Sequence, residues 1–92
     1  MNDDQLQDEL RSLPAWEVCA VEGIGRLRRV FRFNNFVDAL EFTNRVGALA
    51  EEHNHHPQIT TEWGRTTVEW WTHTEGGVGP KDLLLARKTD QL

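Results

Sequence analysis

The chain has 92 residues, of which 38% are hydrophobic and 27% are charged, a mixture that predicts one globular domain over residues 1–92 and excludes a disordered chain. Its formal net charge of -5 disfavours direct binding to nucleic acid, because an acidic protein repels phosphates unless its basic residues cluster on one face. The single cysteine, Cys19, excludes an internal disulfide, and the lack of any signal-like or membrane-spanning segment predicts a cytoplasmic protein with no membrane association.

The first third of the chain is expected to form a helix and a hairpin. Residues 3–12 have apolar positions at helical spacing, which predicts a short amphipathic helix that ends before Pro14. Residues 16–21 and 27–33 predict two strands, and the glycines within 22–25 predict the turn that joins them.

The second of these strands alternates between apolar and basic residues, so it would have one apolar face and one basic face. Arg29 is the exception, because it falls on the apolar side. The segment also contains the only basic cluster of the chain, Arg26, Arg28, Arg29 and Arg32. Since neighbouring residues of a strand point to opposite faces, this cluster would be divided, which again disfavours nucleic-acid binding.

The strongest helix signal covers residues 36–53. Asn35 can cap the N-terminus, and Asp38 lies in the first turn, where a carboxylate is favoured. Asn54 can close the helix, and Pro57 prevents its continuation. The apolar stripe expected to face the core is Phe36, Leu40, Thr43, Val46 or Gly47, and Ala50, widened by Phe42 and Leu49.

Two more strands and a last helix complete the chain. Residues 58–63 and 66–73 predict a hairpin around Gly64-Arg65. A helix is expected to begin at Gly79-Pro80, with apolar contacts from Leu83, Leu84 and Ala86. The order α-β-β-α-β-β-α predicts an α+β fold, a four-stranded antiparallel sheet with three helices on one face.

All four histidines lie in the second half of the chain, three of them within Glu51-Glu52-His53-Asn54-His55-His56-Pro57. Imidazole ordinarily titrates near pH 6.5, so such a cluster suits acid-base catalysis. One alternative is a set of exposed polar residues at a helix C-terminus. Another is a zinc site completed by His73 or Glu51. The zinc site is disfavoured because adjacent histidines diverge in an extended segment and no HExxH signature occurs.

Other chemistry has weaker support. Cys19 has no histidine near it in sequence, which favours a structural thiol over a nucleophile. Gly23-Ile24-Gly25 lacks the third glycine of a dinucleotide loop, and no GxSxG elbow occurs. Trp70 and Trp71 are neighbours in a predicted strand, so one should enter the core and the other could line a pocket or contact another subunit.

Several spaced residues of the second half together resemble the signature of the pterin-4a-carbinolamine dehydratase family. The matching frame is Glu51, His55-His56-Pro57, Trp63, His73 and Asp82. Residues outside this frame also resemble the pattern of the family, namely Trp16, Leu27-Arg28-Arg29-Val30-Phe31-Arg32-Phe33, Phe36, Ala39 and Phe42. The resemblance extends over residues 13–90 and is far more specific than any one dipeptide within it.

The resemblance implies a pterin substrate and a lyase that needs no metal or organic cofactor. Family members dehydrate 4a-hydroxytetrahydropterin to quinonoid dihydropterin, which recycles tetrahydrobiopterin for aromatic amino acid hydroxylases, and they form homodimers or homotetramers. Some relatives act instead as dimerisation partners of a transcription factor or assist enzyme assembly. A non-enzymatic interaction module is therefore the alternative function, and an interface aromatic such as Trp71 would suit it.

The resemblance also implies roles for single residues. His55, His56 and His73 would surround the carbinolamine carbon. His55 or His56 would be the base toward N5, and His73 the acid toward the hydroxyl. Glu51 would orient an imidazole. The other substrate-binding residues would be Pro57, Thr72, Thr74, Glu75 and Asp82. For Asp82, a helix-capping role is an equally good explanation.

Two positions depart from the pattern of the family. The family commonly has an aromatic residue two positions after the proline, where it helps to form the pterin pocket, whereas this chain has Ile59. Stacking on the pterin would then be weaker or come from another aromatic side chain. The family often has Thr or Ser as the cap of the last helix, where this chain has Gly79, a change that bears on helix stability more than on catalysis.

Overall fold

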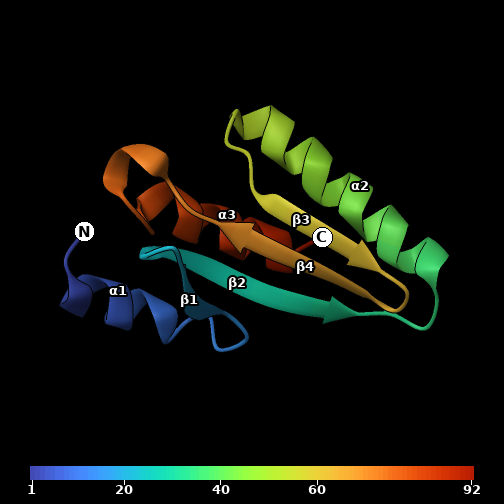
Figure 1. Ribbon diagram of the computed structural model, residues 1–92, viewed down its shortest axis with the longest axis horizontal. Coiled ribbons are helices and arrows are strands. Elements are labelled where there is room, and N and C mark those ends of the chain that lie inside the picture. The colour runs from blue at the N-terminus through green and yellow to red at the C-terminus, as the bar shows by residue number, and fades with distance from the viewer.

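A computed structural model describes residues 1–92 as a four-stranded antiparallel sheet with three α-helices (Figure 1). The elements are, in chain order, α1 (Asp3–Leu10), β1 (Glu17–Val21), β2 (Ile24–Arg32), α2 (Phe36–His53), β3 (Gln58–Glu62), β4 (Arg65–Trp70), a short 3-10 helix η1 (His73–Glu75) and α3 (Pro80–Asp90). The strand order in the sheet is β1-β2-β4-β3. The predicted α+β class and element order are confirmed.

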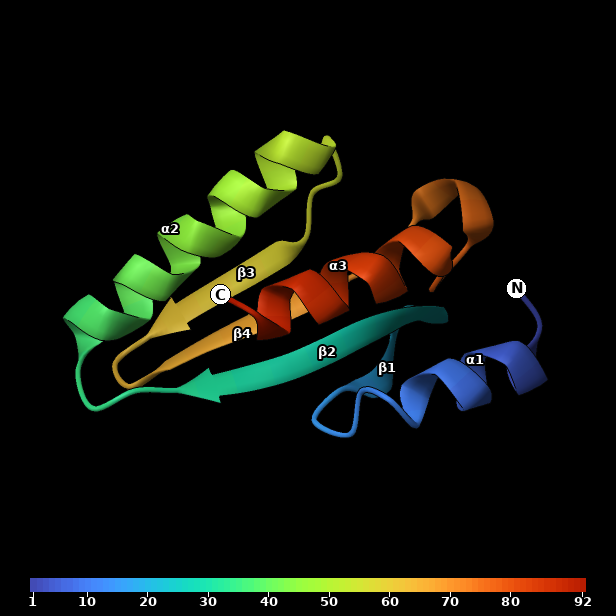
Figure 2. The same cartoon turned by 180° about the vertical axis from the view of Figure 1, so that it is seen from behind.

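The helices pack on one side of the sheet. Helix α2 contacts β3 and β4, and α3 contacts β2 and β4. Figure 1 looks onto the face of β2, β4 and β3 that no helix covers, and Figure 2 shows α3 in front of the strands from behind. None of the helices has the length and apolar character needed to cross a lipid bilayer. The sheet therefore has a core face and an open face.

Helix α1 is shorter than predicted, because it ends at Leu10 rather than at residue 12. Its N-terminus has a capping box, in which the Asn2 side chain accepts from the Gln5 backbone N–H and the Gln5 side chain accepts from the Asn2 backbone N–H. After the helix, Leu13 and Trp16 are both buried in the core. These two side chains anchor the N-terminal segment on the sheet.

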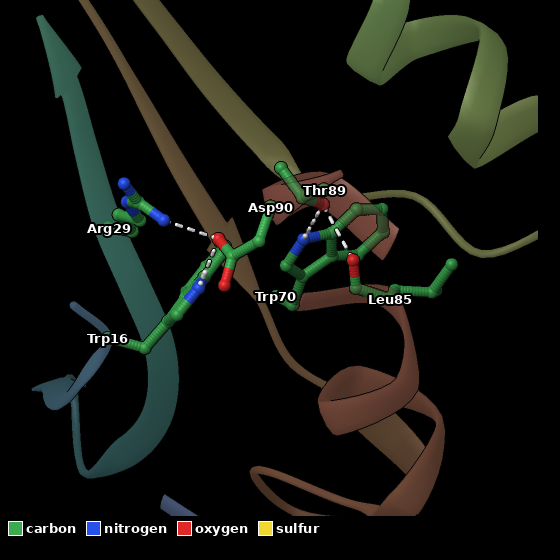
Figure 3. A network of polar contacts seen from close by, with 6 residues as sticks. All are labelled: Trp16, Arg29, Trp70, Leu85, Thr89 and Asp90. Carbon is green, nitrogen blue, oxygen red and sulfur yellow. Dashed lines mark hydrogen bonds and ion pairs between the residues drawn. The ribbon is translucent and has the colours of Figure 1, made fainter. Parts of the chain in front are cut away.

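Arginines of β2 lie on both faces of the sheet, as alternation predicted. In the strand register, Arg28 lies opposite Glu69 of β4 on the open face. Arg29 lies opposite the fully buried Val68 on the core face. Figure 3 shows why an arginine is tolerated there: its Nη1 lies 2.5 Å from Oδ1 of Asp90, which also accepts from the Trp16 indole at 2.9 Å. The half-buried guanidinium is thus neutralised by a half-buried carboxylate.

Helix α2 begins and ends where the sequence predicted. The Asn35 side chain accepts from the Asp38 backbone N–H at 2.7 Å, and Asn54 closes the helix in the left-handed conformation with a φ of 48°. The predicted apolar stripe is partly wrong, because Phe36 and Leu40 are 45% and 43% exposed. The rest of the prediction is confirmed at Phe42, Val46, Leu49 and Ala50, which are buried, and Ala39 is a buried position that was not predicted.

The rotation of α2 follows from a contact between its backbone and the sheet. Ala39 is fully buried, and its carbonyl oxygen accepts a hydrogen bond from the Thr66 hydroxyl at 2.8 Å. A small side chain allows the helix backbone to approach the strand this closely. Phe36 is therefore turned away from the core and toward solvent.

The second hairpin differs from its prediction at the turn and at its far end. Strand β3 ends at Glu62 and β4 begins at Arg65, so the turn is Trp63-Gly64 and not Gly64-Arg65. Gly64 has a φ of 77°, which favours glycine, and Trp63 is 72% exposed. Strand β4 ends at Trp70, not at residue 73, because Thr72 forms only an isolated bridge with Gly77 and η1 begins at His73. The chain therefore turns sharply just after the end of β4.

The core centres on Trp70, which is fully buried. Its indole N–H donates to the hydroxyl of Thr89 at 3.3 Å, and that hydroxyl donates to the Leu85 carbonyl at 2.6 Å (Figure 3). Helix α3 buries Leu83, Leu85 and Ala86. The contact predicted from Leu84 is wrong, because this side chain is 43% exposed.

Candidate active site

Two segments that follow regular elements meet at one end of the sheet. The loop between α2 and β3 carries His55 and His56, and the segment that follows β4 carries Thr72 and then His73, the first residue of η1. Between them lies an open cleft of about 400 Å³, lined by Asn54, His55, His56, Trp71, Thr72, His73 and Thr74. Histidines from distant parts of the chain thus share one hollow.

This cleft is the candidate site because of the residues that line it, and not because of its size. A hollow of about 480 Å³ beside Phe31, Phe33 and Phe42 is larger, but no histidine lines it. Acid-base chemistry needs groups that exchange protons near neutral pH. The cleft between the two histidine segments is therefore the candidate site.

The way in which α2 ends gives the adjacent His55 and His56 different surroundings. Asn54 adopts the left-handed conformation, and the His55 backbone N–H still bonds to the Ala50 carbonyl at 3.1 Å. The chain then leaves the helix in extended form toward β3. As a result, the side chain of His55 is only 14% exposed, whereas that of His56 is 58% exposed.

His55 is held by a buried carboxylate. Its Nε2 lies 2.6 Å from Oδ1 of Asp82, a residue that is completely buried at the start of α3. Oδ2 of Asp82 accepts from the Thr72 hydroxyl at 2.7 Å and from the Gly79 backbone N–H at 2.9 Å. The Asp82 carboxylate therefore caps α3 and holds His55 at the same time.

This network determines which nitrogen of a neutral His55 carries the proton. An ionised carboxylate can only accept hydrogen bonds, so His55 donates through Nε2–H and keeps a lone pair on Nδ1. Below the ring, the indole of Trp70 lies nearly parallel, at 7° and 5.9 Å between centroids. The imidazole is fixed in both tautomer and orientation.

His56 has a weaker counterpart of this arrangement. Its Nε2 lies 2.5 Å from Oε2 of Glu51, and the Glu51 side chain is 77% exposed. The imidazole that Glu51 contacts is thus the exposed one, and the carboxylate partner of His55 comes from a residue 27 positions further along the chain.

His73 is the least restrained imidazole of the cleft. It opens η1, is exposed, and meets the Trp71 ring edge-on, with 5.8 Å between centroids and 70° between planes. It contacts neither Glu51 nor Asp82, the two carboxylates that hold His55 and His56. The cleft therefore combines one fixed imidazole with a freer one.

The other residues predicted to bind substrate fall into two groups. Thr72 and Thr74 line the cleft, whereas Glu51, Pro57, Glu75 and Asp82 do not. Glu75 instead places its carboxylate against Gly79, where an added Cβ would clash with Oε2. Glycine at this position thus allows the Glu75 side chain to reach the start of α3.

Two residues that line the cleft, Asn54 and Trp71, were not among the predicted site residues. Asn54 was predicted only as the cap of the helix, and its place between His53 and His55 was the signal that could have found it. For Trp71, strand alternation next to Trp70 had left a pocket and a subunit contact as alternatives, and the structure places this side chain in the wall of the cleft.

No group of three or more His, Cys, Asp and Glu side chains is arranged to hold a metal ion. His55 and His56 each bind a separate carboxylate on a different element. This divergence is what the sequence predicted for adjacent histidines in an extended segment.

Comparison with known proteins gives consistent matches over nearly the whole chain. The family model described as "Pterin 4 alpha carbinolamine dehydratase" matches residues 1–92. A relative from Syntrophotalea carbinolica is 55% identical over 80 residues, covering 87% of this chain and 71% of the relative. One from Chlorobaculum tepidum is 50% identical over 92 residues, covering 100% and 83%. Both are provisionally named pterin-4-alpha-carbinolamine dehydratases.

Two solved structures share the fold. A transcriptional coactivator/pterin dehydratase from Brucella melitensis has a TM-score of 0.86 and 31% identity, covering 99% of this chain and 95% of that one. A pterin dehydratase-like protein identified as a RuBisCO assembly factor of the α-carboxysome has a TM-score of 0.69 and 22% identity, covering 84% and 87%. The second likeness supports the fold alone.

Proposed function

The chain belongs to the pterin-4a-carbinolamine dehydratase family, and from that premise we propose that it dehydrates 4a-hydroxytetrahydropterin to quinonoid dihydropterin in tetrahydrobiopterin recycling. The observation that carries the proposal is the shared cleft of His55, His56 and His73. Groups that can give and take a proton face one hollow from two separate segments. This is the arrangement that an acid-base dehydration needs.

The reaction breaks one bond to oxygen and one to hydrogen. The C4a–O bond breaks, and the hydroxyl takes a proton from an acid and leaves as water. A base removes the proton from N5, and the electron pair of that N–H bond forms the C4a=N5 double bond. One acid and one base are therefore enough, and the enzyme regains its protonation state by proton exchange with solvent.

We assign the base to His55. Its Nε2–H is bound to the buried Asp82, so the lone pair of Nδ1 is free to accept the N5 proton. A carboxylate behind the ring also stabilises the imidazolium that forms, as in catalytic triads. His73 is then the acid toward the departing hydroxyl, because it lines the same cleft and neither Glu51 nor Asp82 holds its ring.

The other predicted residues are proposed to support the two histidines, some of them through a histidine and others through the pterin or the backbone. Thr72 and Asp82 act through His55, and Glu51 acts through the exposed His56. Thr74 lines the cleft and is proposed to contact the pterin. Pro57 and Glu75, which do not line it, are proposed to fix the two segments that do.

Activity measurements test this function. The dehydration of freshly generated 4a-hydroxytetrahydropterin is followed by absorbance with the protein, with His55→Ala and with His73→Ala. Each variant should lose about 100-fold or more of the catalysed rate, the size of a general acid or base contribution. His53→Ala is the matched control, because His53 does not line the cleft, and it should keep the full rate. A wild-type protein without catalysis would refute the function.

Self-association is a further part of the proposal. The exposed apolar side chains Phe36, Val37 and Leu40 gather at the start of α2, at 45%, 70% and 43% exposure, and a small domain gains stability by covering such a surface. We propose a homodimer or homotetramer in the cytoplasm. Light scattering after size exclusion should give a mass above that of one chain, 10.6 kDa, and a monomer at micromolar concentration would contradict it.

A further inference from the structure

We infer that Trp71 is the side chain on which the pterin ring stacks, and that Arg26 is the positioning residue that holds the indole in place. The inference rests on the proposed function, and it names the specificity-determining aromatic of the same cleft. It starts from the composition of the cleft wall and from one cation–π contact.

Trp71 is the only hydrophobic residue among the seven that line the cleft. A pterin is a flat fused ring system, and such rings are commonly bound by stacking on an aromatic side chain. Thr72, Thr74 and Asn54 can supply hydrogen bonds to the ring edge but no apolar face. Apart from the three imidazoles of the proposed acid-base site, the indole of Trp71 is the one lining side chain with an aromatic face for the ring.

The position where the family commonly has an aromatic residue is not available for this task. Ile59 is paired with Val68 on the core face of the sheet and packs against the core cluster. Trp71 belongs to the other face, because its neighbour Trp70 is paired with Leu27 in the core. In this chain an aromatic wall for the cleft therefore has to come from another position, and Trp71, directly after β4, lies on the opposite face from Ile59.

Arg26 backs the indole from outside the cleft. Its guanidinium carbon lies 4.0 Å from the centroid of the Trp71 ring, and Arg26 is not among the lining residues. One ring face is thus covered by a cation, which leaves the other face or the ring edge to the cleft.

Arg26 is itself restrained. Its Nη1 donates to Oε1 of Gln58 at 3.0 Å and to Oε2 of Glu69 at 3.3 Å, and its side chain is only 16% exposed. An Arg26 side chain held in this way keeps the Trp71 indole that it covers in one rotamer. Preorganised contacts cost less ordering on binding than mobile ones do.

The indole also meets the proposed acid, since His73 packs edge-on against it at 5.8 Å. A pterin stacked on Trp71 would therefore lie next to the His73 imidazole. The stacking residue and the acid are set relative to each other by one contact within three residues of chain.

Binding of an unreactive pterin, 7,8-dihydrobiopterin, tests the inference by calorimetry. Trp71→Leu should raise its Kd about tenfold, from the loss of stacking, and Trp71→Phe should recover most of the affinity. Trp63→Leu is the matched control, because Trp63 is 72% exposed in the β3–β4 turn at the opposite end of β4, and its Kd should equal that of the wild type. Thermal unfolding confirms that each variant is folded.

The role of Arg26 needs a readout that a structural residue would not change. Arg26→Met should raise KM about threefold with kcat unaltered, because the indole loses its cation but the histidines stay in place. Arg26→Lys, which keeps a positive charge, should recover part of the loss. A threefold fall in the kcat of Arg26→Met without a change in its KM would overturn this role.

The outcomes separate the inference from the proposed function. If Trp71→Leu binds the probe as tightly as the wild type, or if Trp63→Leu weakens binding equally, the inference is wrong while catalysis can stand. If the wild type binds the probe through Trp71 but does not speed dehydration, the proposed function is wrong and the inference holds. A wild type that binds no dihydropterin overturns both.

Discussion

Replacing Asp82 with asparagine probes the link between the buried carboxylate and the chemistry of His55. The amide keeps one carbonyl oxygen, which can still accept from the Gly79 N–H and the Thr72 hydroxyl. Where Oδ1 accepted from His55 at 2.6 Å, the variant presents an NH2 group. Two donors cannot face each other, so the imidazole must move its proton to Nδ1 and lose the lone pair that served as base.

The size of both effects follows from this exchange. A hydrogen bond to a charged group contributes roughly 1.5–3 kcal/mol and a neutral one about 0.5–1.5 kcal/mol, so Asp82→Asn should cost about 1–2 kcal/mol of stability. For a chain of this length that lowers Tm by roughly 5–15 °C. The loss of a correctly oriented base should lower kcat by about 100-fold or more, with KM little changed.

Stopped-flow absorbance measures kcat, and circular dichroism during heating measures Tm. Glu41→Gln is the matched control, because Glu41 is also a carboxylate in an ion pair, with Arg45, but it is 60% exposed and does not line the cleft. An exposed pair contributes about 0–1 kcal/mol, so this variant should stay near wild type in both measurements. If Asp82→Asn keeps kcat within a few-fold of wild type, or if the two variants behave alike, the reasoning about the His55 tautomer fails.

Three further predictions concern the fold. Ala39→Leu should cost about 1–3 kcal/mol in urea unfolding by overpacking the contact of α2 with the sheet, whereas Ala48→Leu, on the exposed side of the helix, should stay within about 0.5 kcal/mol; equal costs would contradict the observed helix rotation. Asp90→Ala should cost about 1–2 kcal/mol, because an indole and a guanidinium lose their shared acceptor, and an unchanged urea midpoint would refute that. The hydrogen bond from Arg65, helped by its charge, lowers the pKa of Glu62, so this pair stabilises the fold above the ordinary pKa of glutamate and ceases to do so as pH falls through the lowered value; Glu62→Gln should be less stable than wild type at pH 7 but not at acidic pH, and a constant difference would contradict the linkage.

The parts of the fold predicted best are those encoded in neighbouring residues. Asn35 and Asn54 mark both ends of α2 by local cap geometry, and the structure places the helix between them. The face that α2 buries was predicted less well, because its rotation depends on the contact of Ala39 with Thr66 on a distant strand. A hydrophobic pattern alone could not distinguish Phe36, which is exposed, from a core residue.

The same division holds in the candidate site. The adjacent His55 and His56 are visible as a cluster in the sequence, and the spaced frame includes Asp82. The pairing of Asp82 with His55 could not be predicted, since it joins residues 27 positions apart through the packing of α3. The contact of Arg26 with Trp71 is likewise set by the sheet register and not by any local motif.

A crystal structure of the protein with bound 7,8-dihydrobiopterin tests the central claim most directly. The claim predicts that the pterin lies in the cleft with N5 within hydrogen-bonding reach of His55 Nδ1 and with C4a turned toward the His73 imidazole. A pterin bound elsewhere on the surface, or in the cleft with N5 turned away from both imidazoles, would contradict it.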